Sequence, residues 1–194
     1  MNHPDQVKWN NKYLQKDLSS KLKPSGWLVQ HEDVLRSASP GKALDIACGG
    51  GRNSIYLAEI GFEVQAIDIS DVAIDWLTNQ VNKRQLAITP VRTNLEQFVP
   101  PENSYDVIIN FNYLQRSLFP SIIKALKPGG LLFFQTMNVD HIDKLGFEID
   151  RNFLLEKGEL LQVFSNLEVL AHTEEIVKYS NGKKRGISSF LGRK

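Results

Sequence analysis

The sequence has little cysteine and no long apolar run. Its single cysteine, Cys48, excludes an internal disulfide and a zinc site built from several cysteines. No run approaches about 18 unbroken apolar residues, and the opening MNHPDQVKWNNKY lacks the apolar core of a signal peptide. These absences predict a cytoplasmic protein without a membrane span.

The sequence also lacks an excess of either charge, with 23 basic and 22 acidic residues and a net charge of +1. Surfaces that bind nucleic acid usually carry a basic excess or a basic stripe, so the balance disfavours that partner. The one basic cluster, at residues 182–185 (GKKR), is interpreted as a solvated turn. Over 194 residues, 42% hydrophobic and 23% charged residues fit a single globular domain, 1–194.

Apolar segments alternate with helical patterns along the chain. Strands are predicted at residues 42–48, 62–68, 86–92, 105–111 and 131–137, and helices at 25–36, 52–60 and 118–126, with a further helix capped by Ser70 that buries Ile74, Leu77 and Val81. Pro90 suggests an edge strand. This alternation predicts a mainly parallel sheet covered on both faces.

Both ends of the chain depart from that alternation. Residues 168–177 and 186–191 read as two strands joined by Asn181-Gly182, the turn residues of an antiparallel hairpin. Near the start, Trp9 and Tyr13 lie in a short predicted helix. We therefore expect a core at residues 40–194 and an N-terminal helical lid region at residues 1–39.

Three consecutive glycines, Gly49 to Gly51, stand between the strand at 42–48 and the helix at 52–60. Ordering glycine costs entropy, so a ligand that must approach the main chain is one explanation. Ligands of open parallel sheets lie beyond the carboxyl ends of the strands, near unpaired helix N–H groups. Asp68 ends the next strand, 23 residues after Asp45, a spacing typical of a carboxylate that binds ribose hydroxyls. Together they predict a nucleoside-containing ligand.

Other interpretations of these residues remain open. Taken singly, the glycines could form a tight turn and Asp68 could cap a helix. A nicotinamide site would need G-x-G-x-x-G or G-x-G-x-x-A, but with Gly49 and Gly51 as the first two glycines Ser54 takes the third position. A phosphate-binding P-loop would need G-K followed by Ser or Thr, which the sequence lacks. A nicotinamide oxidoreductase is therefore disfavoured.

The segment ALDIACGGGRNSIYLAEIGFEVQAIDIS resembles the first two motifs of class I S-adenosylmethionine-dependent methyltransferases, and more narrowly their tellurite-methyltransferase-like branch, in which G-x-G-R-N-S-x-x-L-A is typical. NSYDVIINFNYLQRSLFPSIIKALKPGGLLFFQT resembles the fourth and fifth strands of that family, including the K-P-G-G turn. The resemblance covers roughly residues 40–194. It implies an α/β fold: a Rossmann-like three-layer sandwich whose mainly parallel seven-stranded sheet ends in a C-terminal antiparallel hairpin.

The resemblance also implies S-adenosyl-L-methionine as cofactor. The turn Ala47-Cys48-Gly49 would lie against the methionine part, Asp68 would hold the ribose, and Ile69 would pack on the adenine. The full set of expected cofactor-binding residues is Asp45, Ala47, Cys48, Gly49, Gly51, Arg52, Asp68, Ile69, Asn94, Leu95, Asn110 and Phe111. Relatives commonly have glycine at the position of Ala47 and Asp-Leu at the position of Asn94-Leu95; the Asn94 carbonyl can still accept from the adenine amine.

For several side chains the sequence allows two roles. Arg52 either faces solvent or meets the cofactor carboxylate. Cys48 is interpreted as a buried, inert thiol rather than a nucleophile. Trp9 and Tyr13 are interpreted as packing residues of the lid, with substrate contact as the alternative.

A sulfonium already carries an activated methyl group, so transfer by in-line displacement requires mainly alignment. A general base is needed only if the acceptor must lose a proton, and neither a catalytic triad nor a metal site is expected. Tyr113, Arg116 and His141 are candidate contacts of a small-molecule acceptor; packing or surface positions are the alternatives. The predicted function is methyl transfer, with a non-catalytic S-adenosylmethionine-binding regulatory protein as the alternative. The residues point to no particular acceptor or oligomeric state.

Overall fold

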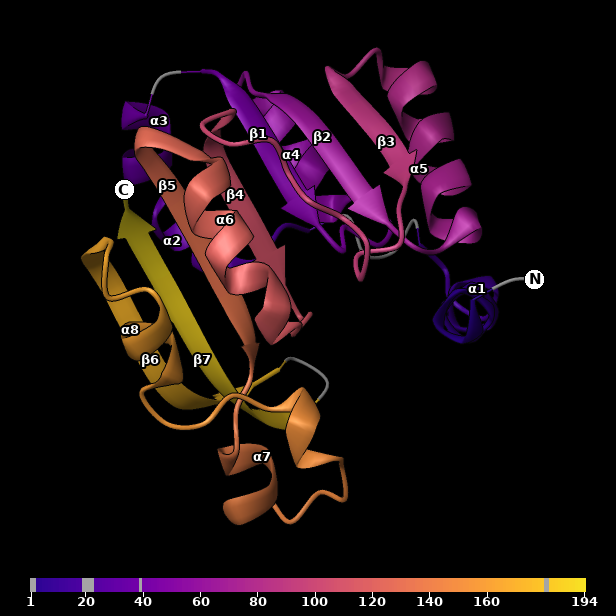
Figure 1. The fold of residues 1–194 in the computed structure, drawn as a ribbon. Helices are drawn as coiled ribbons and strands as arrows, with labels where there is room; N and C mark the ends of the chain where they lie inside the picture. The colour runs from indigo at the N-terminus through magenta and orange to yellow at the C-terminus, as the bar shows by residue number, and fades with distance from the viewer. Residues whose placement is uncertain (1–2, 19–22, 39, 180–181) are drawn as a thin grey trace.

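The computed structural model describes residues 3–18, 23–38, 40–179 and 182–194. Within these ranges one seven-stranded sheet forms, in the order β3-β2-β1-β4-β5-β7-β6 (Figure 1). Its strands are β1 Lys42–Ile46, β2 Glu63–Asp68, β3 Ile88–Arg92, β4 Tyr105–Phe111, β5 Leu126–Met137, β6 Glu168–Lys178 and β7 Lys184–Arg193. Strands β1 to β5 pair in parallel, and β7 runs antiparallel to both β5 and β6. The predicted mainly parallel sheet with an antiparallel hairpin is confirmed.

Helices cover both faces of the sheet, which confirms the three-layer arrangement. They are α1 Pro4–Leu14, α2 Gly26–Gln30, α3 Glu32–Ser37, α4 Arg52–Glu59, α5 Asp71–Arg84, α6 Phe119–Ala125, α7 Asp140–Asp143 and α8 Glu159–Val163, with short 3-10 turns at Arg116–Leu118 and Arg151–Phe153. Helices α2 to α5 bury apolar side chains on one face. Helices α6 and α8 bury theirs on the other.

Local sequence explains several of these elements. Strands β1 and β4 are almost wholly buried because helices cover both faces of the sheet, and most of their side chains are apolar. Ser70 caps α5, since its Oγ accepts from the Ala73 N–H at 3.3 Å. Pro90 lies in β3, and β3 is an edge strand as predicted, where a missing N–H is tolerated.

Several local predictions were wrong. The helix predicted at 25–36 is split into α2 and α3, because His31 leaves helical geometry (φ −113°, ψ 29°) with its ring edge-on to Trp27. The residues predicted as a turn at 127–130 belong to β5, where Gly129 adopts φ +79° beside a register shift against β4. The strand predicted from residue 86 begins at Ile88, and the strand predicted at 42–48 ends at Ile46, because Ala47 has φ +55°.

The C-terminal hairpin closes through bonds that Tyr179 makes. Its N–H donates to the Lys183 carbonyl at 2.8 Å, and its carbonyl accepts from the Gly182 N–H at 2.9 Å. Of the predicted Asn181-Gly182 turn, Asn181 lies outside the described residues, while Gly182 has φ +79°. Arg185, predicted in a solvated turn, instead lies in β7 because that strand starts at Lys184.

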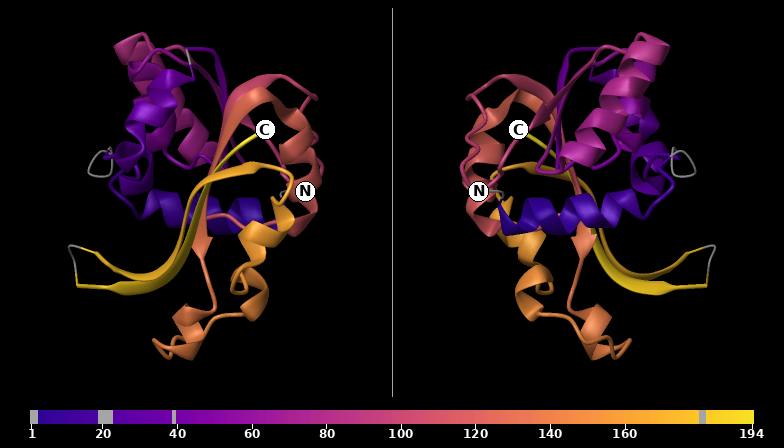
Figure 2. Two further views of the ribbon diagram at one scale, coloured as in Figure 1. Left: turned by 90° about the vertical axis from the view of Figure 1, so that its left-hand side faces the viewer. Right: turned by 90° about the vertical axis from the view of Figure 1, so that its right-hand side faces the viewer.

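Three segments surround the carboxyl ends of the parallel strands. In the view of Figure 1, helix α1 crosses below the sheet and α7 lies below the end of β5. The β6–β7 hairpin curves away from the sheet (Figure 2). The strand order reverses between β1 and β4, the usual ligand position in such sheets. Every helix in the described ranges is too short or too polar to span a bilayer.

Candidate active site

A cavity of about 1340 Å³ lies at this carboxyl edge. The turns that follow β1, β2 and β4 form its floor, and α1 and the hairpin contribute its walls. A second cavity, of about 490 Å³, is lined by Lys42, Glu63 and Lys127 at the opposite edge, away from the glycines. The larger cavity occupies the β1–β4 switch point and is the candidate site.

The glycine turn after β1 is built from left-handed residues. Ala47, Gly49 and Gly51 have φ of +55°, +55° and +75°. A Cβ on Gly49 would strike the Tyr13 side chain, and one on Gly51 would strike Leu77 of α5. Gly49 therefore leaves room for the Tyr13 side chain against the turn, and Gly51 leaves room for Leu77. Among the described residues, Gly50 lines the cavity and Gly51 does not.

Asp68, at the end of β2, ties the two loops of the site together. Its Oδ2 accepts from the Gly49 N–H at 2.8 Å, and its Oδ1 accepts from the Ser70 N–H at 2.9 Å. Burial raises the pKa of Asp68, and these backbone donors counteract the rise. A carboxylate has about four acceptor positions, so it can also accept from hydroxyls in the cavity.

A second carboxylate, Asp45 of β1, stands behind the turn with 2% of its surface exposed. Its Oδ2 accepts from the Ser54 hydroxyl at 2.6 Å. Burial raises the pKa of Asp45 to about 7; the charge of Asp68 adds to the rise, while Ser54 and Arg52 oppose it. Asp45 thus adds a buried carboxyl group with few hydrogen-bond donors to the cavity wall.

Arg52 and Cys48 both line the cavity. Arg52 is half-buried at the start of α4, where its Nη1 donates to the Lys23 carbonyl at 3.5 Å. Burial lowers the pKa of its guanidinium, and Asp45 acts in the opposite direction. Burial raises the pKa of the Cys48 thiol, and its Sγ contacts the Gly49 carbonyl at 3.5 Å. Arg52 is partly exposed and also lines the cavity, and the raised pKa of Cys48 keeps it a thiol.

The remaining expected cofactor residues separate into two groups. Ile69, Asn94, Leu95 and Phe111 line the cavity. The Asn94 Oδ1 already accepts from the Glu96 N–H at 3.0 Å. Asn110 is buried beneath the wall, where its Nδ2 donates to the Tyr113 carbonyl at 2.8 Å. Asn110 holds the turn after β4 and is not part of the described cavity lining.

Of the candidate acceptor contacts, the structure brings only Tyr113 to the described cavity lining. Its hydroxyl donates to Gln115 at 2.5 Å, and burial raises its pKa to about 12. Arg116 instead pairs with Glu159 at 2.7 Å and donates to the Leu154 carbonyl at 2.8 Å. His141 is 8% exposed and stacks on Phe147, with ring centroids 4.4 Å apart.

The sequence interpretation missed two parts of the cavity wall. The first is a hydrogen-bond chain in which Ser25 Oγ donates to Gln135 at 3.3 Å and Gln135 Nε2 donates to Ser189 Oγ at 2.8 Å. The second is one face of the hairpin: Glu175, Val177 and Tyr179 of the β6 side, and Lys183, Arg185 and Ile187 of the β7 side. The two-residue alternation of the hairpin could have revealed the second part.

In the described ranges, three or more His, Cys, Asp or Glu side chains nowhere gather as a metal site would require.

Comparison with known proteins assigns the chain to a family. The family model for the tellurite resistance protein TehB matches residues 19–188. The "Probable S-adenosyl-L-methionine-dependent methyltransferase TehB" of Haemophilus influenzae (strain ATCC 51907 / DSM 11121 / KW20 / Rd) is 32% identical over 157 residues, covering 75% of this chain and 54% of that protein. The ubiquinone biosynthesis O-methyltransferase of Coxiella burnetii (strain Dugway 5J108-111) is 32% identical over 100 residues, covering 49% of this chain and 43% of that protein.

A solved structure agrees with this family. The crystal structure of TehB from Haemophilus influenzae superposes with a TM-score of 0.71 at 28% identity, covering 84% of this chain and 62% of that one. The chain spans about half the length of the curated relatives it matches. It belongs to the TehB family of tellurite resistance proteins, a branch of the S-adenosylmethionine-dependent methyltransferases.

Proposed function

We propose that this chain binds S-adenosylmethionine at the β1–β4 switch point and methylates a small-molecule acceptor by in-line displacement. One observation carries the proposal: Asp68 of β2 accepts the Gly49 N–H of the turn after β1 at 2.8 Å. That bond places a buried carboxylate beside a main chain without a Cβ, on the wall of one cavity.

The cavity residues fit this cofactor by their chemistry. Asp68 would accept from the ribose hydroxyls, and the apolar side chains Ile69 and Leu95 would contact the adenine. Arg52 would meet the carboxylate of the methionine part, because it is a half-buried cation at a helix N-terminus, where unpaired N–H groups also favour an anion. The volume of about 1340 Å³ exceeds the roughly 300–1,000 Å³ usual for small-ligand sites and leaves room for an acceptor.

When bound, the cofactor supplies a methyl group that is already activated as a sulfonium. The chain itself has to align the acceptor and exclude water, and alignment can contribute roughly 7–11 kcal/mol. Tyr113 keeps its proton at neutral pH because burial raises its pKa to about 12, so it does not act as a base. Its O–H donates to Gln115, and its oxygen can still accept a hydrogen bond from a group in the cavity. Gln135, Ser25 and Ser189 offer further neutral polar contacts on the acceptor side.

Two rival functions give different expectations. For a nicotinamide oxidoreductase, the third fingerprint position would be Gly or Ala. Here it is Ser54, whose hydroxyl donates to Asp45 at 2.6 Å. A non-catalytic binding protein would close its acceptor half, whereas this cavity extends past Tyr113 to the hairpin. A cytoplasmic location, a single domain and the absence of a nucleic-acid partner stay predictions from the sequence.

A panel of thiols, oxyanions and amines, assayed by release of S-adenosylhomocysteine, tests the proposed activity. We expect turnover with at least one acceptor class. Binding of S-adenosylhomocysteine without turnover on any class would favour the regulatory alternative, and tighter binding of a nicotinamide dinucleotide would favour the oxidoreductase.

A further inference from the structure

The Arg116 guanidinium holds the main chain on both sides of Phe153. Its Nη1 donates to the Asn152 carbonyl at 3.0 Å, and its Nη2 donates to the Leu154 carbonyl at 2.8 Å. Its Nε and Nη2 also donate to the two carboxylate oxygens of Glu159, at 2.7 and 2.9 Å. These four bonds, the Arg116 clamp, join the segment after β4 to the 3-10 turn that ends at Phe153 and to α8.

The Arg116 clamp is partly shielded from water. The Glu159 side chain is 12% exposed, and its Oε2 also accepts from the Glu156 N–H at 2.8 Å. A planar guanidinium with five N–H donors can serve one carboxylate and two carbonyls in a fixed geometry, whereas a lysine ammonium on a flexible stem cannot. The main chain on both sides of Phe153 is therefore held in place.

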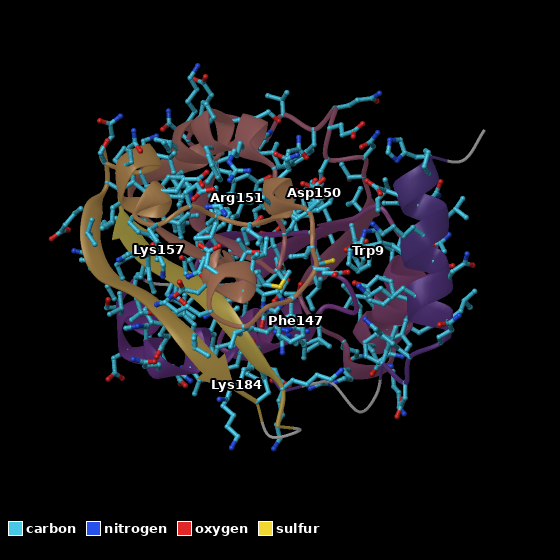
Figure 3. All side chains as sticks on the ribbon, turned by 90° about the horizontal axis from the view of Figure 1, so that it is seen from below. Trp9, Phe147, Asp150, Arg151, Lys157 and Lys184 are labelled. Carbon is cyan, nitrogen blue, oxygen red and sulfur yellow. The ribbon has the colours of Figure 1, made fainter. Side chains whose placement is uncertain are left out.

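The Phe153 ring lies at the rim of the cavity. It lines the cavity, and 55% of the residue is exposed. Lys8 Nζ of α1 lies 5.9 Å from the centre of the ring, so the ring reaches from the segment after β5 towards α1. In Figure 3, Asp150 lies between Arg151 and Trp9 of α1. Phe153 thus presents an apolar surface both to the cavity and to solvent.

The Arg116 clamp also connects Phe153 to another part of the cavity wall. Tyr113 and Leu114 line the cavity, and Arg116 follows them directly in sequence after Gln115. Arg116 itself is outside the described cavity lining. A change at Arg116 therefore alters how Phe153 is held without removing a side chain from the cavity wall.

We propose that Arg116 is a positioning residue for the methyl acceptor: it fixes the Phe153 ring at the rim of the cavity, where the ring contacts an apolar group of the acceptor. This inference rests on the proposed function and adds a substrate class to it, acceptors with an aromatic or other apolar part. Such an acceptor and the exposed ring remove apolar surface from water when they meet, which is favourable. A wholly polar acceptor gains less from the ring.

Two pairs of small acceptors that differ in apolar surface test the proposal: benzyl mercaptan against 2-mercaptoethanol, and benzylamine against ethanolamine. We expect the wild type to prefer the aromatic member of at least one pair by about tenfold or more in kcat/KM. Phe153→Ser and Arg116→Ala are each expected to lower that preference to below about threefold, mainly through a higher KM for the aromatic acceptor. The affinity of both variants for S-adenosylhomocysteine, measured by calorimetry, is expected to change less than about twofold.

Two further variants separate the carbonyl contacts from the charge. Arg116→Lys keeps a positive charge opposite Glu159 but lacks the planar fork, and it is expected to lose most of the preference. Arg151→Ala is the matched control. The Arg151 guanidinium forms a similar pair with Glu156, at 2.7 and 2.9 Å, but within the described residues its bonds reach only carboxylates. Arg151→Ala is expected to keep the wild-type preference.

Hydrogen exchange gives a second measurement, which does not require turnover. The Phe153 N–H donates to the Asp150 carbonyl at 3.0 Å, and the Leu154 N–H donates to the Arg151 carbonyl at 2.9 Å. In Arg116→Ala these amides are expected to exchange about tenfold faster or more, because the turn opens more often. Circular dichroism of each variant separates loss of folding from loss of positioning.

Unchanged exchange in Arg116→Ala, or a wild-type preference in Phe153→Ser or Arg116→Lys, would overturn the inference. A wild type that shows no aromatic preference, or that methylates an oxyanion and none of the four compounds, would overturn it as well. Failure of the wild type to bind S-adenosylhomocysteine, or to methylate any acceptor of the wider panel, would instead contradict the proposed function.

Discussion

Two buried carboxylates of the site differ in how many donors they accept from. Asp68 accepts from two backbone N–H groups, at 2.8 and 2.9 Å. Asp45 accepts from the Ser54 side chain at 2.6 Å while it is 2% exposed. Burial raises the pKa of both carboxylates, and for Asp45, with few donors to oppose it, the pKa rises to about 7.

This raised pKa makes stability depend on pH. Between the ordinary pKa of 3.8 and about 7, folded Asp45 retains a proton that the unfolded chain has lost, so its contribution to stability falls as pH rises through that window. Asp45→Asn keeps an oxygen for Ser54 and removes the ionisation. Relative to the wild type, the variant gains up to about 4 kcal/mol in free energy of unfolding by about pH 8, since each pKa unit corresponds to about 1.4 kcal/mol.

Urea unfolding of both proteins at several pH values between about 4 and 8 measures the difference. The exposed Asp75→Asn in α5 is the control, with a change below about 0.5 kcal/mol at every pH. Curves for the wild type and Asp45→Asn that stay parallel across this window would show that Asp45 ionises normally.

Residues of the site were predictable where the spacing is local. Gly49, Asp68 and Ile69 follow strand ends that the apolar pattern marks, and all three line the cavity. Arg116 also follows a strand end, but its position depends on Glu159, 43 residues away in sequence. No local pattern reports such a pairing, so its contact with α8 became visible only in the structure.

At the scale of elements, Gly51 joins the glycine turn to two helices. It precedes α4 with φ +75°, and Leu77 of α5 occupies the space where a Cβ would lie. Gly51 allows the turn to pack closely against α5. It was expected to contact the cofactor, but it does not line the cavity among the described residues.

Gly51→Ala is expected to destabilise the protein by two effects. The left-handed conformation costs an alanine about 1–2 kcal/mol, and the clash with Leu77 adds at least about 1 kcal/mol. Gly129→Ala is the matched control, because Gly129 has φ +79° with open space around it and pays only the conformational cost. Urea unfolding compares the two. Equal losses would mean that Leu77 does not restrict the turn.

Element boundaries followed the sequence where polar turns flank an apolar run. Strand β4 occupies Tyr105–Phe111 as predicted, because Asn103-Ser104 precedes it and Asn112 follows it with φ +59°. The segment predicted as one helix at 25–36 has no proline or glycine at its break. Contacts of His31 with Trp27 decide that break, and they form only after the chain folds.

At the scale of the whole molecule, the strand–helix alternation predicted the sheet and its ligand edge but not the walls of the cavity. The hairpin becomes a wall because β7 inserts between β5 and β6. Helix α1 becomes a wall because Asn10 bonds Ser70, 60 residues away in sequence. Both depend on long-range pairing, which composition and spacing do not encode.

The central claim is that the glycine turn and Asp68 hold one adenosyl ligand between them. Calorimetry with S-adenosylhomocysteine on the wild type, Asp68→Ala and Asp75→Asn tests it most directly. Asp75→Asn changes an exposed carboxylate of α5 outside the described cavity lining, and it is expected to change affinity less than about twofold. Asp68→Ala is expected to bind at least about tenfold more weakly, or about 1.4 kcal/mol. An Asp68→Ala variant that folds and binds S-adenosylhomocysteine as tightly as the wild type would contradict the claim.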